Sequence, residues 1–180
     1  APVGTTHEQI EEIQRDATMT ANQLGVQIVG GHTEITSAVN QCVLSVAVIG
    51  RMNKVKLMDS SRIEAGDVVA VSKSLGLEGS AILASDRRED LEKHLSDDEM
   101  HEANSYLDLI SVLEEGRIGA ELGVQYMHDI TEGGLFGAIY EAAEAIGKGI
   151  TLKGPFPFTA VTKKIAAYFS GSRHSKFDAE

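Results

Sequence analysis

Short apolar runs alternate along this chain with longer segments whose apolar residues recur at helical spacing, and this alternation constrains the fold more than any other feature. The run 42–49 is apolar on both alternations except at Ser45, which is typical of a strand covered on both faces. Strands that alternate with helices predict an α/β or α+β fold, although the pattern leaves the strand order open. The predicted strands are 26–29, 42–49, 68–71, 125–130 and 150–152.

Capping boxes predict where two of the helices begin. Two overlapping boxes, at 5–8 and at 6–9, are alternative starts for the first helix, and Gly25 can end it in the left-handed conformation. Ser96 with Glu99 begins a later helix in the same way. Further helices are predicted up to Leu122, over 133–145 and over 159–169.

The 180 residues allow one domain of ordinary size or two small ones. Residues 50–65 are mixed, charged and irregular, which is typical of a domain boundary. We therefore predict an N-terminal domain over 1–58 and a C-terminal domain over 59–180.

The charge balance excludes some classes of protein. Against 27 acidic residues stand 16 Lys and Arg, so the formal charge is 16 − 27 = −11, which opposes binding to a nucleic-acid backbone. No apolar run approaches the roughly 18 residues of a membrane-spanning helix, and no signal peptide is visible. We expect a soluble, cytoplasmic protein with no nucleic-acid or membrane partner. The acid-rich stretch 86–102 favours a solvated helical hairpin over an interaction surface, and Cys42 is expected in the core.

The segment 127–135 is the strongest local signal for chemistry, because two glycines stand where a strand meets a helix. Backbone amides at a helix N-terminus bind anions, and Gly133 with Gly134 lets a phosphate approach the backbone. Asp129 can hold a Mg²⁺ ion that bridges phosphate oxygens, and Thr131 can cap the helix. The alternative is a capped helix with glycines for tight packing, and the pattern alone slightly favours this alternative.

A second candidate loop follows the first predicted strand, which ends in paired glycines. Such a loop can offer a carboxylate to a metal ion and a histidine as acid or base. Its residues are Gly30, Gly31, His32, Thr33 and Glu34. A third candidate is Lys73 in a glycine-punctuated loop, where the lysine can meet a phosphate or simply be exposed.

Three segments of the chain, taken in their order, resemble the ATP-dependent enzymes related to aminoimidazole ribonucleotide (AIR) synthase. These segments are GVQIVGGHTEIT (25–36), GDVVAVSKSLGLEG (66–79) and MHDITEGGLFGA (127–138). Within that superfamily the chain is most similar to the hydrogenase maturation factor HypE and its relatives. The resemblance implies a PurM-like two-domain fold, with the N-terminal domain incomplete here and helices packed on a mixed sheet in the C-terminal domain. It also implies ATP and Mg²⁺ as cofactors, and phosphoryl transfer to an amide-like oxygen.

The resemblance implies a role for each matching residue. Asp129 and His32 are the expected catalytic residues, and Asp129 with Glu34 is expected to bind the metal. The expected ATP-binding residues are Gly30, Gly31, His32, Thr33, Lys73, Thr131, Gly133 and Gly134. The expected partners are a second copy, bound through the N-terminal domain, and a maturation protein.

Some residues depart from the family pattern. His32 stands where HypE-like sequences usually carry Asp, which is compatible with a selenophosphate-synthetase-like enzyme. The acidic ligands that precede the first helix in the family, and its reactive tail cysteine, are absent here, so we expect a part of a longer protein. The alternative for this stretch is a non-catalytic module used for dimerisation or regulation.

Overall fold

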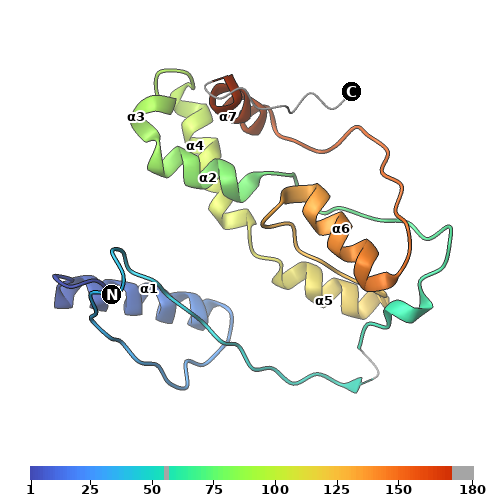
Figure 1. Ribbon diagram of the computed structural model, residues 1–180, viewed down its shortest axis with the longest axis horizontal. Coiled ribbons are helices and arrows are strands. Elements are labelled where there is room, and N and C mark those ends of the chain that lie inside the picture. The colour runs from blue at the N-terminus through green and yellow to red at the C-terminus, as the bar shows by residue number, and fades with distance from the viewer. Residues whose placement is uncertain (55–56, 172–180) are drawn as a thin grey trace. The chain divides into compact units, whose positions relative to one another are not determined.

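The computed structural model describes residues 1–54 and 57–171 (Figure 1). By its internal contacts the chain divides into two units, Ala1–Arg51 and Met52–Glu180. The predicted domain boundary after residue 58 stays a prediction.

The first unit contains one helix, α1 (His7–Gln23). Thr6 is its N-cap and forms the predicted capping box with Gln9, so the second of the two alternative starts is the observed one. Gly25 follows with φ +66°, the left-handed conformation predicted for the end of this helix. No residue of this unit is buried, so local capping rather than a core holds α1.

The start of the chain anchors the loop that follows α1. The Ala1 ammonium donates to the Glu34 carbonyl at 2.7 Å, and the Thr36 amide donates to the Ala1 carbonyl at 2.9 Å. Pro2 and Thr36 form a parallel bridge. These contacts fix one end of the loop that carries the candidate residues 30–34.

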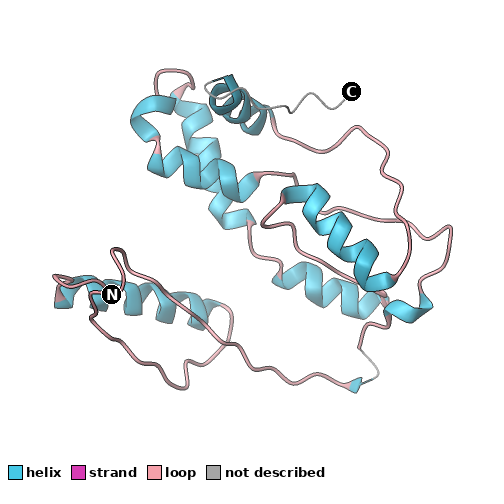
Figure 2. Cartoon of the chain, in the orientation of Figure 1, coloured by secondary structure: helices cyan, strands magenta, loops and turns pink. Residues whose placement is uncertain are grey.

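The second unit consists of short helices joined by extended segments (Figure 2). In chain order the elements are η2 (Ser60–Arg62), α2 (Leu77–Asp86), α3 (Arg88–Leu91), α4 (Asp97–Ser105), η3 (Tyr106–Leu109), α5 (Leu113–Leu122), α6 (Gly134–Ile146) and α7 (Ala160–Gly171). The capping box of Ser96 with Glu99 is confirmed at the start of α4, and Gly123 ends α5 with φ +73°.

The core of the second unit lies among α2, α3, α4, η3 and α7, which pack together in Figure 1. Leu91, Val161 and Ile165 are its largest fully buried side chains. Ala81 and Ala84 are also fully buried and let neighbouring helices approach α2 closely. Apolar burial is the main stabilising term for this cluster.

A chain of hydroxyl groups runs through the same core. The Ser80 hydroxyl donates to the Gly76 carbonyl at 2.7 Å and lies 3.1 Å from the Thr162 hydroxyl. Thr159 donates to Thr162 at 3.0 Å, and the Tyr106 hydroxyl lies 2.7 Å from that of Thr159. Buried polar groups are costly unless they are paired, so this network joins α2, α7 and η3.

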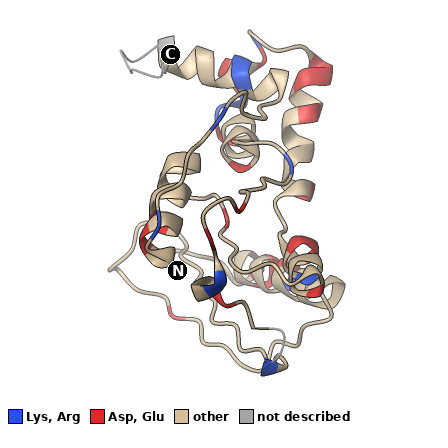
Figure 3. Ribbon diagram, turned by 90° about the vertical axis from the view of Figure 1, so that its right-hand side faces the viewer, with Lys and Arg blue, Asp and Glu red and all other residues tan. Residues whose placement is uncertain are grey.

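The acid-rich stretch 86–102 folds as the predicted solvated helices, α3 and the first part of α4 (Figure 3). Exposed ion pairs between residues three or four apart offset part of the negative charge of this stretch. They are Arg87 with Asp90 at 2.5 Å and Arg88 with Glu92 at 2.6 Å. Pairs of this exposed kind add little to stability. They keep a highly charged face in water while Leu91 and Leu95 point into the core.

The prediction of an α/β or α+β, PurM-like fold with a mixed sheet is wrong for the residues that the structure describes, which form helices and no strand. The five runs predicted as strands are extended, but none finds a partner strand within 1–54 and 57–171. Most apolar side chains of the runs 26–29, 42–49 and 68–71 are exposed, with Val29 at 93%, Ile49 at 97% and Val68 at 95%, whereas Ile130, Ile150 and Leu152 in the other two runs are half-buried.

The physical reason for this error is that periodicity reports which side chains are apolar and not which backbone pairs with which. A strand exists only where its N–H and C=O groups bond to a neighbouring segment. Cys42 lies in one of these runs and is exposed, so its predicted place in the core is also wrong. Among the described helices, none is both long and apolar enough to cross a membrane.

Candidate functional site

The turn before α6 places the candidate residues of the strongest motif. Gly133 is the N-cap of α6 with φ +77°, and Gly134 follows with φ +59°. The Gly134 amide donates to the Thr131 carbonyl at 3.1 Å, which closes the turn. The predicted Thr131 side-chain cap is therefore absent, because the N-cap position falls on Gly133 and receives no side-chain hydrogen bond.

The glycines of this turn are required by space as well as by conformation. A Cβ atom on Gly133 would lie 3.2 Å from the Gly137 Cα atom, and one on Gly137 would lie 3.0 Å from the Glu132 carbonyl oxygen. Left-handed backbone is also costly for residues other than glycine. The sequence EGGLFG therefore forms a tight turn in which the glycine positions carry no side chain over the backbone.

Two backbone amides are free at this end of α6. Those of Leu135 and Phe136 have no hydrogen-bond acceptor in the part of the chain that the structure describes. Amides in the first helical turn lack intrahelical acceptors and carry partial positive charge. Together with the bare glycines, they form a surface that a phosphate group can approach.

His128 forms the best-defined polar contacts near this turn. Its Nδ1 atom lies 2.6 Å from the Asp129 carbonyl oxygen, and its Nε2 atom lies 2.9 Å from a carboxylate oxygen of Glu141 on α6. The Asp129 carbonyl, helped by the Glu141 carboxylate, raises the pKa of His128. The two contacts tie the loop to α6, and when the ring is protonated it donates to both acceptors at once.

Sequence reasoning missed His128 as a residue that positions the loop. His128 and Glu141 are 13 residues apart, so no helical or strand spacing links them. Only its place directly before Asp129 in the motif pointed to it.

Asp129 offers an exposed carboxylate. Its side chain is 59% exposed, and its nearest cation is the His128 ring, with Nδ1 3.8 Å from the carboxylate. Within 1–54 and 57–171, no three His, Cys, Asp or Glu side chains are grouped so as to hold a metal ion. One carboxylate fits a Mg²⁺ ion that is bound mainly by phosphate oxygens and water, and does not fit a cage made by protein alone.

Lys73 is placed by other protein groups. Its Nζ atom donates to the Ser111 carbonyl at 2.6 Å and lies 2.8 Å from the Glu115 carboxylate. The lysine hydrogen bond holds the pKa of Glu115 below its usual range. Lys73 also has φ +59°, a conformation uncommon outside glycine. Its ammonium thus ties its loop to α5 and would have to exchange partners to meet a phosphate.

The other predicted residues lie in the first unit, within the loop 30–34. All five are exposed, and a Cβ atom on Gly30 or Gly31 would meet nothing within 4 Å. The side chains of His32 and Glu34 make no hydrogen bond to the residues that the structure describes, whereas the Glu34 carbonyl accepts the bond from Ala1. The predicted site residues thus form two groups, one in each unit.

The second unit is therefore a helical domain with a candidate phosphate-binding turn. This turn combines glycines, two backbone amides without an acceptor and one exposed carboxylate. Residues 64–172 match the family model described as AIR synthase related protein, C-terminal domain. That match covers more than half of the chain, so the chain belongs to the AIR-synthase-related family. The resemblance stated from the three motifs is thereby confirmed.

One similar protein is a putative hydrogenase expression/formation protein of Methanocaldococcus jannaschii. It is 32% identical over 151 residues, which cover 84% of this chain and 43% of that protein. The chain thus spans less than half the length of this relative. No solved structure matches the chain.

Proposed function

We propose that this chain is part of an ATP-dependent enzyme of the AIR-synthase type. The observation that carries the proposal is the turn 129–137, in a chain that belongs to this family. There the exposed carboxylate of Asp129 stands four residues before Gly133, the first of the two glycines that lead into the free amides of α6. In this proposal Asp129 holds a Mg²⁺ ion on the phosphates, and the amides of Leu135 and Phe136 donate to phosphate oxygens.

The chemistry follows from what these groups can do. Bound ATP supplies a phosphoryl group, which converts an amide-like oxygen into a leaving group. Fixed amides and a cation stabilise the charge on the phosphates. The negative formal charge of the chain makes Mg²⁺ and a helix terminus better suited than a basic patch.

The residues of the first unit complete the proposal. Gly30, Gly31 and Thr33 belong to the proposed nucleotide-binding loop, Glu34 to the metal ligands, and His32 to the acid–base groups. The exposure of all these residues supports the proposal, because the glycine backbone and the side chains of His32, Thr33 and Glu34 are available to a ligand. A second copy of the chain, bound through the N-terminal domain, is the proposed partner.

The relative in M. jannaschii suggests the process in which this enzyme works. The description of that protein, hydrogenase expression/formation, supports the proposal that this chain acts in hydrogenase maturation. A cytoplasmic location and a maturation protein as partner belong to the same proposal. The substrate in this proposal carries an amide-type oxygen.

The test is the thermal stability of the full-length protein with ATP, measured with and without Mg²⁺. Ligand at about 100 times its Kd stabilises the folded state by about 2.7 kcal/mol, so a clear rise in Tm is expected. An Asp129→Asn change should remove the Mg²⁺-dependent part of the rise. Asp108→Asn is the matched control, since Asp108 is an exposed acid on η3, outside the motif.

A normal fold without any ATP-dependent rise would contradict ATP binding and favour a non-catalytic dimerisation module. Rises of equal size in the Asp129→Asn protein and the wild type would remove Asp129 from the metal site.

A further inference from the structure

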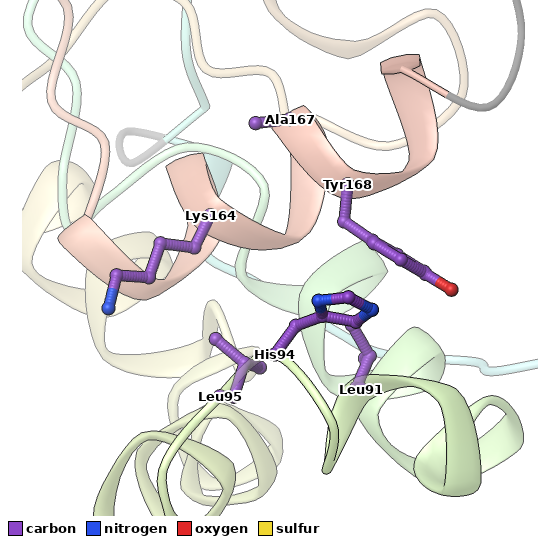
Figure 4. A pocket seen from close by; sticks show the side chains of 6 residues that line it. All are labelled: Leu91, His94, Leu95, Lys164, Ala167 and Tyr168. Carbon is purple, nitrogen blue, oxygen red and sulfur yellow. The ribbon is translucent and has the colours of Figure 1, made fainter.

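A cavity of about 350 Å³ lies between the turn after α3 and helix α7 (Figure 4). Its lining residues are Leu91, His94, Leu95, Lys164, Ala167 and Tyr168. None of them belongs to the residues proposed for ATP. The cavity volume falls in the range of small-molecule sites, roughly 300–1,000 Å³.

The floor of the cavity is apolar and rigid. Leu91 is fully buried and Leu95 is 7% exposed, and both belong to the core cluster of the unit. Both belong to one buried cluster with residues of α2, α4 and α7, so their places are set by the core and not by a ligand. A preformed apolar floor favours a ligand with an apolar body.

Aromatic rings form one wall of the cavity. The His94 ring lies beside that of Tyr168, with centroids 4.4 Å apart and planes tilted by 36° (Figure 4). Tyr168 in turn meets Phe169 edge to face at 4.9 Å. Such rings prefer other flat rings in offset or edge-to-face contact, so the wall favours an aromatic ligand over an aliphatic one.

The polar groups of the cavity favour a neutral ligand. The Lys164 ammonium is paired with the Glu99 carboxylate, so its charge is already offset. The ring nitrogens of His94 and the hydroxyl of Tyr168 make no hydrogen bond to other described residues. These groups can donate to, or accept from, one polar edge of a ligand.

We propose that this cavity binds a small, flat and uncharged aromatic molecule with one polar edge. The ring of the ligand lies beside Ala167 and the exposed part of Leu95, above the buried Leu91, and its edge meets His94 or Tyr168. The site is separate from phosphate binding, so it neither needs nor supports the proposed ATP site.

The test uses indole as the probe, titrated into the full chain and followed by amide and ring NMR signals. We expect saturable shifts confined to 91–95 and 164–168, with a Kd on the order of 1 mM, as nine ligand atoms allow. Indole-3-acetate should bind more weakly, because its carboxylate finds no unpaired cation. Diffuse shifts that do not saturate would overturn the proposal, and tighter binding of the anion would overturn the assignment of a neutral ligand.

Two variants of α7 separate the cavity from the rest of the helix. Ala167→Leu fills the cavity and should weaken indole binding by about tenfold or more, whereas Ala166→Leu adds the same volume at an exposed position outside it and should leave binding unchanged. Circular dichroism of both variants checks that the helices remain. Equal binding by the folded Ala167→Leu protein, or equal loss in both variants, would contradict the proposed site.

Discussion

At the scale of single residues, the turn before α6 shows how conformation and space act together. Gly133 adopts a left-handed φ, and the space around its missing Cβ is taken by the backbone of Gly137. Other glycines of the chain, such as Gly149, have neither constraint. The two kinds of glycine therefore respond differently to the same substitution.

Gly133→Ala should lower the free energy of unfolding by about 1–2 kcal/mol, the cost of left-handed backbone in an alanine. Gly149→Ala is the control and should leave stability within about 0.5 kcal/mol of the wild type. Urea denaturation of the two variants measures the difference. Equal stability of both would show that the turn readily takes another conformation.

The ion pair of Glu99 with Lys164 should make the stability of the second unit depend on pH in the acid range. The hydrogen bond from Lys164, together with that from the Ser96 amide, holds the pKa of Glu99 below its usual value of 4.5. Because the folded pKa is lower than the unfolded one, this stabilisation is complete above about pH 4.5 and is lost as the pH falls through the folded pKa.

Glu99→Gln keeps a side-chain acceptor for the Ser96 amide but removes the charge. We expect its urea midpoint to lie below that of the wild type at pH 7, and the difference to shrink at pH 3. A difference that is the same at both pH values would show that the charge of Glu99 contributes nothing.

At the scale of elements, a polar network joins helices that are far apart in the sequence. The Tyr106 hydroxyl of η3 contacts the Thr159 hydroxyl, which caps α7 through the Thr162 amide, and lies 2.6 Å from the Glu102 carboxylate of α4. Burial, with the Glu102 carboxylate, raises the pKa of Tyr106, so the phenol stays protonated and can donate. The network thereby fixes where α7 begins against α4 and η3.

Tyr106→Phe keeps the ring and removes the hydroxyl. The hydroxyl has two partly buried hydrogen-bond partners, Glu102 and Thr159, so their loss should cost about 1–3 kcal/mol of stability. Amide hydrogen exchange should become faster at the start of α7, since that end loses its link to η3. Faster exchange spread evenly over all helices would instead indicate a general loss of packing.

At the scale of the whole molecule, the two units differ in how they are stabilised. The second unit has a core of buried side chains around Leu91 and Ile165. The first unit has no buried residue and depends on the capping box of α1 and the contacts of Ala1. A change in the core should therefore act on one unit alone.

Leu91→Ala removes a fully buried side chain and should destabilise the second unit by about 2–5 kcal/mol. Hydrogen exchange should accelerate together in α2, α4 and α7, and stay unchanged in α1. Ile82→Ala is the control, because Ile82 lies on the neighbouring helix α2 but is 47% exposed, so its loss should cost much less. A matching acceleration in α1 would show that the units unfold as one.

The sequence by itself determined where several of the helices begin and end, and it determined the family, although it did not predict α2 (Leu77–Asp86). The capping boxes at Thr6 and Ser96 and the helix-ending Gly25 and Gly123 are local signals, because each depends on neighbours within one turn. The order of the three motifs identified the AIR-synthase-related family, which the family model matches. Asp129 and the glycines before α6 were likewise visible as a strand-to-helix motif.

Only the tertiary structure decided what the extended runs and the isolated side chains do. The apolar run 42–49 lies exposed, because a strand needs a partner that no local pattern names. Lys73 pairs with Glu115, and His128 with Glu141, across separations that no periodicity links. The cavity beside Tyr168 likewise arises from two segments that are far apart in the sequence, since Leu95 and Tyr168 are separated by 73 positions. Contacts of this kind depend on how helices pack, and packing is a property of the folded chain.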